Sequence, residues 1–288
     1  MMIRRYFELV KFAHTIFAMP FAMIGFVYAL RTQGFATERC WPVLLLQVVL
    51  CMVFARNAAM GFNRWADRRI DAANPRTAGR EIPSGKISPR AALLFVVANA
   101  LLFIATAATI NPLTGLLSPA ALFVVLFYSY CKRFTALAHL VLGLGLGIAP
   151  VGAYLAVTGT FAWPPCILTL LVATWCGGFD IIYALQDAAF DRRHGLHSIP
   201  ARFSARGALA ISSLLHLCSI AALLWFGSYC PQNGLLWAGQ GLFALILFAE
   251  HLLVTPTRQR NIGIAFGTLN GLASAALAVF VITALLVE

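Results

Sequence analysis

Nine long apolar stretches follow one another along this chain of 288 residues, and they constrain its fold more than any other feature. A helix needs about 20 mostly apolar residues to cross a bilayer. Each stretch is bounded by charged residues, by prolines or by clusters of Asn and Gly, which end helices. The stretches predict helices over residues 7–30, 42–66, 91–110, 114–131, 137–157, 164–187, 207–228, 234–254 and 262–286.

The composition excludes the common soluble classes. Hydrophobic residues make up 61% of the chain and charged residues 11%, whereas soluble domains are about 45–50% apolar and about 25% charged. The longest polar segments, 67–90 and 188–206, are too short for a soluble domain of their own. We therefore expect an all-α fold: a single domain over residues 1–288, built as an integral membrane bundle of nine transmembrane helices.

The net charge of +11 follows membrane topology rather than a nucleic-acid surface. If the N-terminus is cytoplasmic, the 21 Lys and Arg residues all fall in cytoplasmic segments except Arg31, Arg39 and Arg56. The cytoplasmic set begins with Arg4, Arg5 and Lys11 near the N-terminus. The pattern predicts a multi-pass protein of the inner (cytoplasmic) membrane with no nucleic-acid partner.

Acidic residues are rare, and half of the ten lie in two short clusters at the predicted cytoplasmic ends of helices 42–66 and 164–187. The first cluster, NRWADRRID, spaces Asn63, Asp67 and Asp71 four residues apart, within about 80° of one helical face. The second, DIIYALQDAAFD, puts Asp180, Asp187 and Asp191 within about 20° of a common stripe. An ionisable side chain at membrane depth is costly and indicates a functional site.

A displacement of 120 residues lays the first cluster over Tyr183, Asp187 and Asp191 of the second, and a loop with a proline follows each cluster. The pattern predicts two pseudo-repeated halves around a central cavity, with the site between them. The repeat is imperfect because Met60 stands where Asp180 would have its counterpart.

Two facing rows of carboxylates suit a hard cation that keeps water and bridges phosphate oxygens, which is the habit of Mg²⁺. Interleaved basic side chains could neutralise the remaining charge of a diphosphate. These basic residues are Arg64, Arg68, Arg76, Arg80, Lys132, Arg133, Arg192 and Arg193. The residues alone thus favour a Mg²⁺-dependent site for a diphosphate ester.

The two motifs, N-x-x-x-D-x-x-x-D and D-x-x-Y-x-x-x-D-x-x-x-D, resemble those of the UbiA superfamily of intramembrane aromatic prenyltransferases. The flanking segments NPRTAGREIPSGKIS, YSYCKRFTALAHLVLG and FDRRHGLHSIPARF are similar to its 4-hydroxybenzoate polyprenyltransferase branch. That branch includes enzymes thought to prenylate 1,4-dihydroxy-6-naphthoate on the futalosine route to menaquinone. The resemblance covers essentially the whole chain.

The resemblance implies a donor site for Mg²⁺ and a polyprenyl diphosphate. Metal binding falls on Asp67, Asp71, Asp180, Asp187 and Asp191, and the catalytic residues are Asp67, Asp71, Asp187 and Asp191. Diphosphate binding falls on Asn63, Arg76, Lys132, Tyr183 and Arg192. An allylic diphosphate ionises as its leaving group is neutralised, and an electron-rich aromatic ring attacks the cation in a dry chamber. Asp191 or Asp187 is the candidate base, and the prenyl tail is expected to run between helices towards lipid.

Arg56 lies seven residues before Asn63 on the same stripe, roughly 10 Å deeper in the membrane. One interpretation is that it pairs with the carboxylate of an aromatic acid acceptor, and the other is a structural pair with one of the aspartates. His14 and His139, within apolar segments, are more typical of packing residues.

Two smaller features remain open. Gly263, Gly267 and Gly271 predict close packing of the last helix, with Asn270 bonding across it or lining the chamber. Cys40 and Cys230 fall on the same predicted side of the membrane, so a disulfide between them is conceivable.

The rival function from another class is an ion-coupled transporter, which would also combine repeats with intramembrane acids. Clustering of the acids at one membrane face, rather than at the midplane, argues against it. Within the enzyme class, the motifs specify donor chemistry, so protohaem, homogentisate or a phosphorylated sugar or glycerol stay open as other acceptors. Respiratory quinone synthesis is the expected pathway.

Overall fold

The computed structural model describes residues 6, 9, 17–36 and 39–287, and this part of the chain folds into helices and short loops without a strand. The long helices are α2 (Met19–Thr32), α3 (Trp41–Ala66), α5 (Pro89–Ile110), α6 (Pro112–Cys131), α7 (Ala138–Thr158), α8 (Trp163–Ala184), α11 (Ala205–Gly227), α12 (Gly234–Leu253) and α13 (Asn270–Leu286). The expected all-α bundle is confirmed.

Five short elements join the long helices in the part of the chain that the structure describes. They are α4 (Arg68–Ala73), the 3₁₀ turn η2 (Leu185–Asp187), α9 (Ala188–Arg193), α10 (Ile199–Arg202) and the π-helical segment η3 (Ile264–Leu269). Except for η3, they lie in the two polar segments that follow α3 and α8. These are the segments that carry the acidic motifs.

Helices α5 and α6 each begin two residues before their predicted start, because each opens on a proline. Proline has no N–H to lose at the first helical position, and its fixed φ suits a helix. Pro89 and Pro112 open α5 and α6 directly after a capping residue: Ser88 Oγ accepts from the N–H of Ala91, and Asn111 Oδ1 accepts from the N–H of Thr114.

Within the described residues, eight helices are long and apolar enough to cross a membrane, and α2 is a shorter apolar helix. The predicted first span begins at residue 7, so most of its first ten residues lie outside the described part of the chain, as do Arg4, Arg5, Lys11 and His14. Large apolar side chains on the outside include Leu94, Leu116 and Trp163, which are 70%, 77% and 76% exposed. Such a surface suits lipid rather than water.

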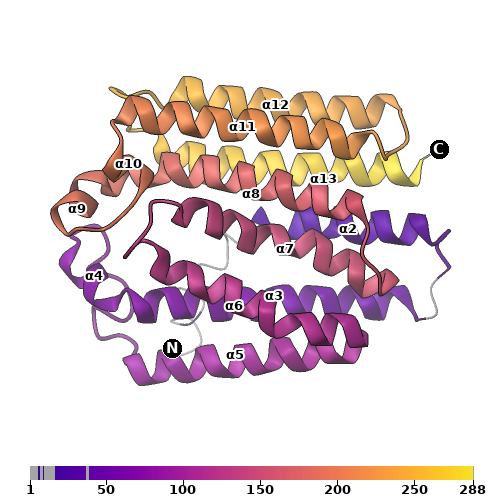
Figure 1. Cartoon of the computed structure of the whole chain (residues 1–288), viewed down its shortest axis with the longest axis horizontal. Helices are drawn as coiled ribbons and strands as arrows, with labels where there is room; N and C mark the ends of the chain where they lie inside the picture. The colour runs from indigo at the N-terminus through magenta and orange to yellow at the C-terminus, as the bar shows by residue number, and fades with distance from the viewer. Residues whose placement is uncertain (1–5, 7–8, 10–16, 37–38, 288) are drawn as a thin grey trace.

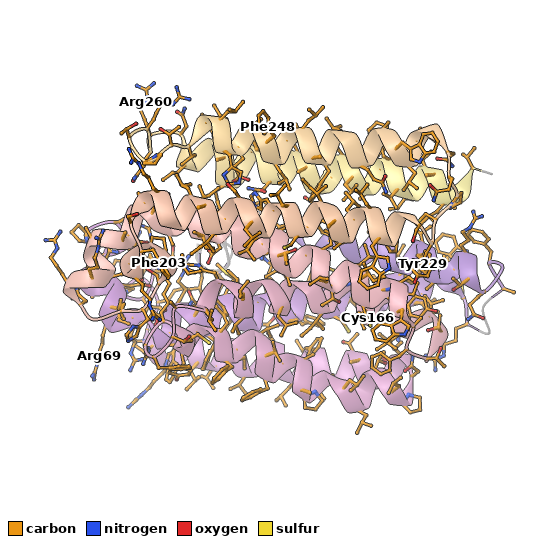
Figure 2. The ribbon with its side chains drawn as sticks, turned by 45° about the horizontal axis from the view of Figure 1, so that its top comes forward. Arg69, Cys166, Phe203, Tyr229, Phe248 and Arg260 are labelled. Atoms are coloured by element: carbon orange, nitrogen blue, oxygen red, sulfur yellow. The ribbon has the colours of Figure 1, made fainter. Side chains whose placement is uncertain are left out.

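The long helices run roughly parallel, and the short helices α4, α9 and α10 gather at one end of the bundle (Figure 1). α7 packs against both α8 and α2, α8 packs against α11, and α3 packs against α5. Figure 2 shows Arg69 and Arg260 at the end that holds the short helices, whereas Cys166 and Tyr229 lie at the opposite end. The polar loops that carry the motifs therefore share one end of the molecule.

The internal repeat is visible at this end. α4 follows α3 after a single intervening residue, and α9 follows α8 after the 3₁₀ turn; the bounds of α4 and α9 are 120 residues apart. In Figure 1 the two short helices lie beside each other although they are far apart in sequence. This brings the two acidic motifs to one place.

The predicted close packing of the last helix is absent at Gly263 and Gly267, two of the three glycines of that row. A Cβ built on Gly263 or Gly267 meets no atom within 4 Å, and the chain there is a π-helix. Asn270 does bond across the bundle, accepting from Trp175 Nε1 and donating to Glu250 Oε1. Cys40 and Cys230 are free thiols, the first exposed and the second buried.

Candidate active site

The helix that carries the first motif breaks at Asp67. α3 ends at Ala66 and α4 begins at Arg68, yet Asp67 N–H donates to Asn63 O and Asp71 N–H donates to Asp67 O. The three motif residues therefore keep nearly helical spacing across the break. A similar break, the turn η2, separates α8 from α9 within the second motif. Each half thus turns its aspartates inward where a membrane-spanning helix ends.

Both motifs line one polar pocket with a volume of about 170 Å³. It contains nine of the predicted site residues: Asn63, Asp67, Asp71, Arg76, Lys132, Asp180, Tyr183, Asp187 and Asp191. The site expected between the two halves is therefore assembled by the fold, from residues more than 100 positions apart.

Basic side chains pair with the aspartates of the first motif. Arg133, after α6, donates to Asp67 Oδ1 over 3.1 Å, and Arg80, in the loop after α4, donates to Asp71 Oδ1 over 2.6 Å. Asn63 Nδ2 donates to the other oxygen of Asp67 over 3.3 Å. Each of the two carboxylates is thus held by an arginine from outside α3 and α4, and Asp67 also by Asn63 of α3.

Arg76 joins the two motifs. It follows the first motif in sequence, but its guanidinium binds both carboxylate oxygens of Asp187, with Nε 2.8 Å from Oδ1. It also donates to the hydroxyl of Tyr183 over 3.1 Å. Asn74, two residues before Arg76, adds a hydrogen bond of 3.0 Å to Asp187 Oδ1. A two-pronged contact of this kind fixes the orientation of the carboxylate as well as its position.

The remaining aspartates of the second motif have different partners. Asp191 Oδ2 accepts from Ser198 Oγ over 2.8 Å and lies 3.9 Å from Lys132 Nζ. Asp180 Oδ2 lies 2.6 Å from Nδ1 of His139. Among the described residues, Asp180 is the one aspartate of the pocket with neither an Arg nor a Lys partner.

The surroundings shift the pKa values of two groups on the polar side of the membrane. Burial raises the pKa of Asp67 above its ordinary value, and the hydrogen bond from Arg133 offsets this in part. Burial would lower the pKa of Arg76, but its contacts with Asp187 and Tyr183 outweigh burial and raise it. Arg76 therefore stays a fixed positive charge in the pocket.

A second cavity, of about 430 Å³, adjoins the polar pocket and is lined almost entirely by apolar residues of α3, α5, α6 and α7. Tyr128 and Leu142 line both cavities, so they mark the junction. Arg56 lies in the apolar cavity, with its Nε buried and without a hydrogen-bond partner in the described structure. A structural pair would require an ion pair between Arg56 and an aspartate. None occurs among the described residues.

The fold does not bring Arg192 to the pocket. Its side chain is exposed on α9, and its Nε donates to the carbonyl of Ala188 one turn earlier. Conversely, sequence reasoning missed Asn74, Tyr128 and Ser198. Their signals were weak but present, because Asn74 opens the NPRT segment, Tyr128 stands one turn before Lys132, and Ser198 belongs to the HSIP segment.

The residues of the pocket fit Mg²⁺. Their ligand atoms are carboxylate oxygens, which a hard cation prefers, and Asp71 Oδ2 is buried without a hydrogen-bond partner. Within the described part of the chain, no three acidic, His or Cys side chains converge as a ready-made metal cage. Such a cage is not required, because Mg²⁺ is usually held by one or two carboxylates together with water and substrate phosphates.

Comparison with known proteins shows the family of this chain. The model of the UbiA prenyltransferase family matches residues 18–273. A 4-hydroxybenzoate octaprenyltransferase of Vibrio vulnificus is 31% identical over 77% of both chains. Another, of Vibrio campbellii, is 34% identical over 74% of this chain and 72% of the relative.

Solved structures show the same fold. The apo structure of a UbiA homolog from Aeropyrum pernix K1 superposes with a TM-score of 0.83 at 31% identity, covering 94% of this chain and 97% of that one. A UbiA homolog from Archaeoglobus fulgidus, solved with GPP and Mg²⁺, has a TM-score of 0.71 at 20% identity, covering 96% and 99%. The chain therefore belongs to the UbiA prenyltransferase family and is a multi-pass membrane prenyltransferase.

Proposed function

We propose that this prenyltransferase moves a polyprenyl group from an allylic diphosphate to a ring carbon of an aromatic acid, with Mg²⁺ at the diphosphate. The observation that carries the proposal is the junction at Tyr128, where a pocket lined by five aspartates meets a large apolar cavity. A charged head and an apolar tail are the two parts of a polyprenyl diphosphate. The relatives named 4-hydroxybenzoate octaprenyltransferase support the aromatic acid acceptor.

The diphosphate would bind in the polar pocket. Arg76, Lys132, Asn63 and Tyr183 are the proposed donors to its oxygens, and the five aspartates are the proposed ligands of Mg²⁺. Bound Mg²⁺ would neutralise charge that builds up on the leaving diphosphate. Arg76 supports this role because it is a permanent cation held between the motifs by Asp187. Its contribution grows as the carbon–oxygen bond breaks and the diphosphate gains charge.

The apolar cavity would hold the prenyl tail and keep water from the allylic cation. Water would otherwise capture the cation before the aromatic ring attacks it. Alanines and glycines such as Ala121, Gly145 and Gly152 contribute to the lining and leave room for an extended chain. A tail longer than the cavity would continue between helices into lipid.

Arg56 is the proposed partner of the acceptor carboxylate. It lines the apolar cavity together with Tyr128, and its buried Nε is free to donate. A guanidinium can bind a carboxylate through two parallel hydrogen bonds, which would orient the ring towards the junction. The ring proton would then pass to a carboxylate of the second motif, for which Asp191 and Asp187 are the two proposals.

The basic residues on the polar loops support a cytoplasmic N-terminus and a site that faces the cytoplasm. We place the protein in the inner membrane and its reaction in respiratory quinone synthesis. With 4-hydroxybenzoate as acceptor the pathway would lead to ubiquinone, and with 1,4-dihydroxy-6-naphthoate it would lead to menaquinone. The acceptor alone decides between them.

Purified protein tests the proposal directly. Geranyl and longer diphosphates are offered with 4-hydroxybenzoate, 1,4-dihydroxy-6-naphthoate, homogentisate or protohaem, with and without Mg²⁺, and Asp67→Ala serves as the inactive control. We expect a prenylated aromatic acid that disappears on chelation and in the variant. If only homogentisate or only protohaem gave a product, that compound would replace the aromatic acid as the proposed acceptor. Counterflow of a soluble substrate in liposomes, without any product, would favour a transporter.

The role of Arg56 has its own test. Arg56→Ala is expected to raise the KM for the acceptor roughly tenfold to a hundredfold, the cost of a lost charged hydrogen bond, while the donor KM stays near that of the wild type. Initial rates at varied acceptor and varied donor separate the two constants. An unchanged acceptor KM would show that Arg56 does not bind the acceptor.

A further inference from the structure

His139 is buried next to the polar pocket, in contact with Asp180, which lines it. It lies in the first turn of α7, it is 0% exposed, and it is not among the residues that line the pocket. A buried histidine in an apolar helix is commonly a packing residue. Two hydrogen bonds of its ring nevertheless connect it to the site.

The first bond fixes Asp180, whose Oδ2 lies 2.6 Å from Nδ1 of the ring. The second runs over 3.4 Å from the backbone N–H of Ile199 to Nε2. A backbone N–H can only donate, so Nε2 must be the nitrogen that carries the lone pair. In the neutral ring the proton then sits on Nδ1 and is donated to Asp180.

Asp180 therefore has a different kind of partner from the other aspartates of the pocket. The other four each have an Arg or Lys partner: Arg133, Arg80, Arg76 and Lys132. Asp180 receives a hydrogen bond from a neutral ring at one oxygen, and its Oδ1 has no hydrogen bond from a described residue. Its carboxylate is therefore oriented without being paired with an arginine or lysine, which leaves its negative charge for a cation in the pocket.

The same ring also reaches the far end of the motif. Ile199 begins α10, and Ser198 just before it caps that helix, accepting from Ala201 N–H over 3.2 Å. Ser198 Oγ donates in turn to Asp191 Oδ2 over 2.8 Å, and Ser198 is 0% exposed. A chain of short contacts thus runs from Asp180 through His139 to the backbone next to the residue that holds Asp191.

We propose that His139 is a positioning residue for the divalent cation: it aims Asp180 at the pocket and holds the 198–199 backbone that fixes Asp191. The inference rests on the proposed function, because it assigns the cation to the same pocket. A partner behind a metal ligand commonly changes metal affinity by about 10–100-fold when it is removed.

Two substitutions separate the bonds of the ring. The amide of His139→Asn reaches the position of Nδ1 and keeps a donor for Asp180, whereas the amide of His139→Gln reaches the position of Nε2 and keeps an acceptor for Ile199. His139→Ala removes both. His216→Gln is the matched control, since His216 is 2% exposed on α11 and contacts His251 instead of the pocket.

The measurement is the Mg²⁺ concentration needed for half-maximal binding of a thio-substituted geranyl diphosphate that resists ionisation, followed by calorimetry. We expect this concentration to rise about tenfold or more in His139→Gln and His139→Ala. The rise should be smaller in His139→Asn, which keeps the bond to Asp180, and His216→Gln should stay within about threefold of the wild type. The melting temperature of each variant reports whether it folds.

Equal losses in the Asn and Gln variants, in step with their melting temperatures, would show that His139 is a packing residue and overturn the proposal. So would unchanged Mg²⁺ dependence in His139→Gln. If the wild type binds the analogue without Mg²⁺, the proposed donor site fails first, and the assignment of His139 to a cation fails with it.

A readout that needs neither metal nor substrate separates the two failures. ¹⁵N chemical shifts of histidine-labelled protein, with His139→Gln to assign the signal, report which ring nitrogen carries the proton. We expect the proton of His139 on Nδ1. In isoleucine-labelled protein, we expect the signal of the Ile199 amide to move in His139→Asn. A proton on Nε2 would overturn the positioning of Asp180, whatever the donor-binding experiment gives.

Discussion

At the scale of single residues, Arg76 does most to make two motifs into one site. It follows the first motif in sequence and binds Asp187 and Tyr183 of the second. Its charge also sits where a diphosphate would need it. Without the Arg76 side chain, the Asp187 carboxylate would keep one hydrogen bond from a described residue, the one that the amide of Asn74 donates.

We predict that Arg76→Ala lowers kcat/KM for the donor by about 10²–10³-fold, the usual cost of removing one preorganised donor to a leaving group. Arg69→Ala is the matched control, because Arg69 is an exposed arginine on α4 outside the pocket and points away from the bundle in Figure 2. Initial rates at saturating acceptor give both values. Equal activity of the two variants would contradict the role of Arg76.

The sequence was most informative for residues whose spacing is regular. The aspartates could be found because they recur four or seven residues apart near helix ends, and Arg76 because it lies in a segment that resembles the family. Asn74, Ser198 and Tyr128 escaped, since a polar residue in a loop shows its partner only after folding. Arg192 was grouped with the site by proximity in sequence, and its role in diphosphate binding stays a prediction.

At the scale of elements, the site depends on close contact between α7, which carries His139, and α8, which carries Asp180. Gly143 and Gly147 make this contact: a Cβ at Gly143 would lie 2.2 Å from the carbonyl oxygen of Ala173, and one at Gly147 would lie 2.8 Å from that of Thr169. Small residues four apart commonly let membrane helices approach in this way.

Gly143→Ala is therefore expected to destabilise the protein by about 1–3 kcal/mol, the usual cost of overpacking, because backbone must move to admit the methyl group. In Gly145→Ala, on the same helix, the new Cβ lies 3.4 Å from Val125 Cγ1, so little change is expected. Thermal unfolding in detergent compares the two. A Gly143→Ala protein as stable as Gly145→Ala would show that this contact is looser than the structure implies.

Sequence reasoning looked for such packing at Gly263, Gly267 and Gly271 instead. Both rows have the same four-residue spacing, and spacing does not reveal which face of a helix meets a neighbour. Gly263 directly precedes the π-helical segment Ile264–Leu269 and Gly267 lies within it, and neither makes close contact with a neighbour. Helix existence follows from local composition, whereas helix pairing depends on the whole bundle.

At the scale of the whole molecule, the adjoining cavities predict how the enzyme selects donor length. Gly152 lines the apolar cavity, and a Cβ there meets no atom within 4 Å, so a larger side chain would project into free space. We predict that Gly152→Leu lowers kcat/KM for the longest donors by at least about tenfold relative to geranyl diphosphate, since each displaced methylene is worth about 1–3 kcal/mol.

Gly241→Leu controls for bulk alone, because Gly241 on α12 also has open space around its Cβ and does not line the cavity. Competition between geranyl and longer diphosphates in one assay gives the selectivity. If Gly152→Leu leaves the distribution of product lengths as in the wild type, the tail does not occupy this cavity.

The all-helical fold and its number of long apolar stretches could be predicted because a bilayer demands about 20 apolar residues for each span. The repeat pointed correctly to one site shared by both halves. The polar and apolar cavities could not be predicted in detail, because their shape depends on tertiary contacts such as Arg76 with Asp187 and α7 with α8.

The central claim is that the two motifs form one Mg²⁺-dependent diphosphate site. Calorimetric binding of the ionisation-resistant geranyl analogue, with and without Mg²⁺, tests it in the wild type, in Asp67→Asn and in Asp187→Asn. We predict tight binding that requires Mg²⁺ and is lost in each variant, although the two aspartates come from different halves. Binding that does not need Mg²⁺, or that survives in one of the two variants, would contradict it.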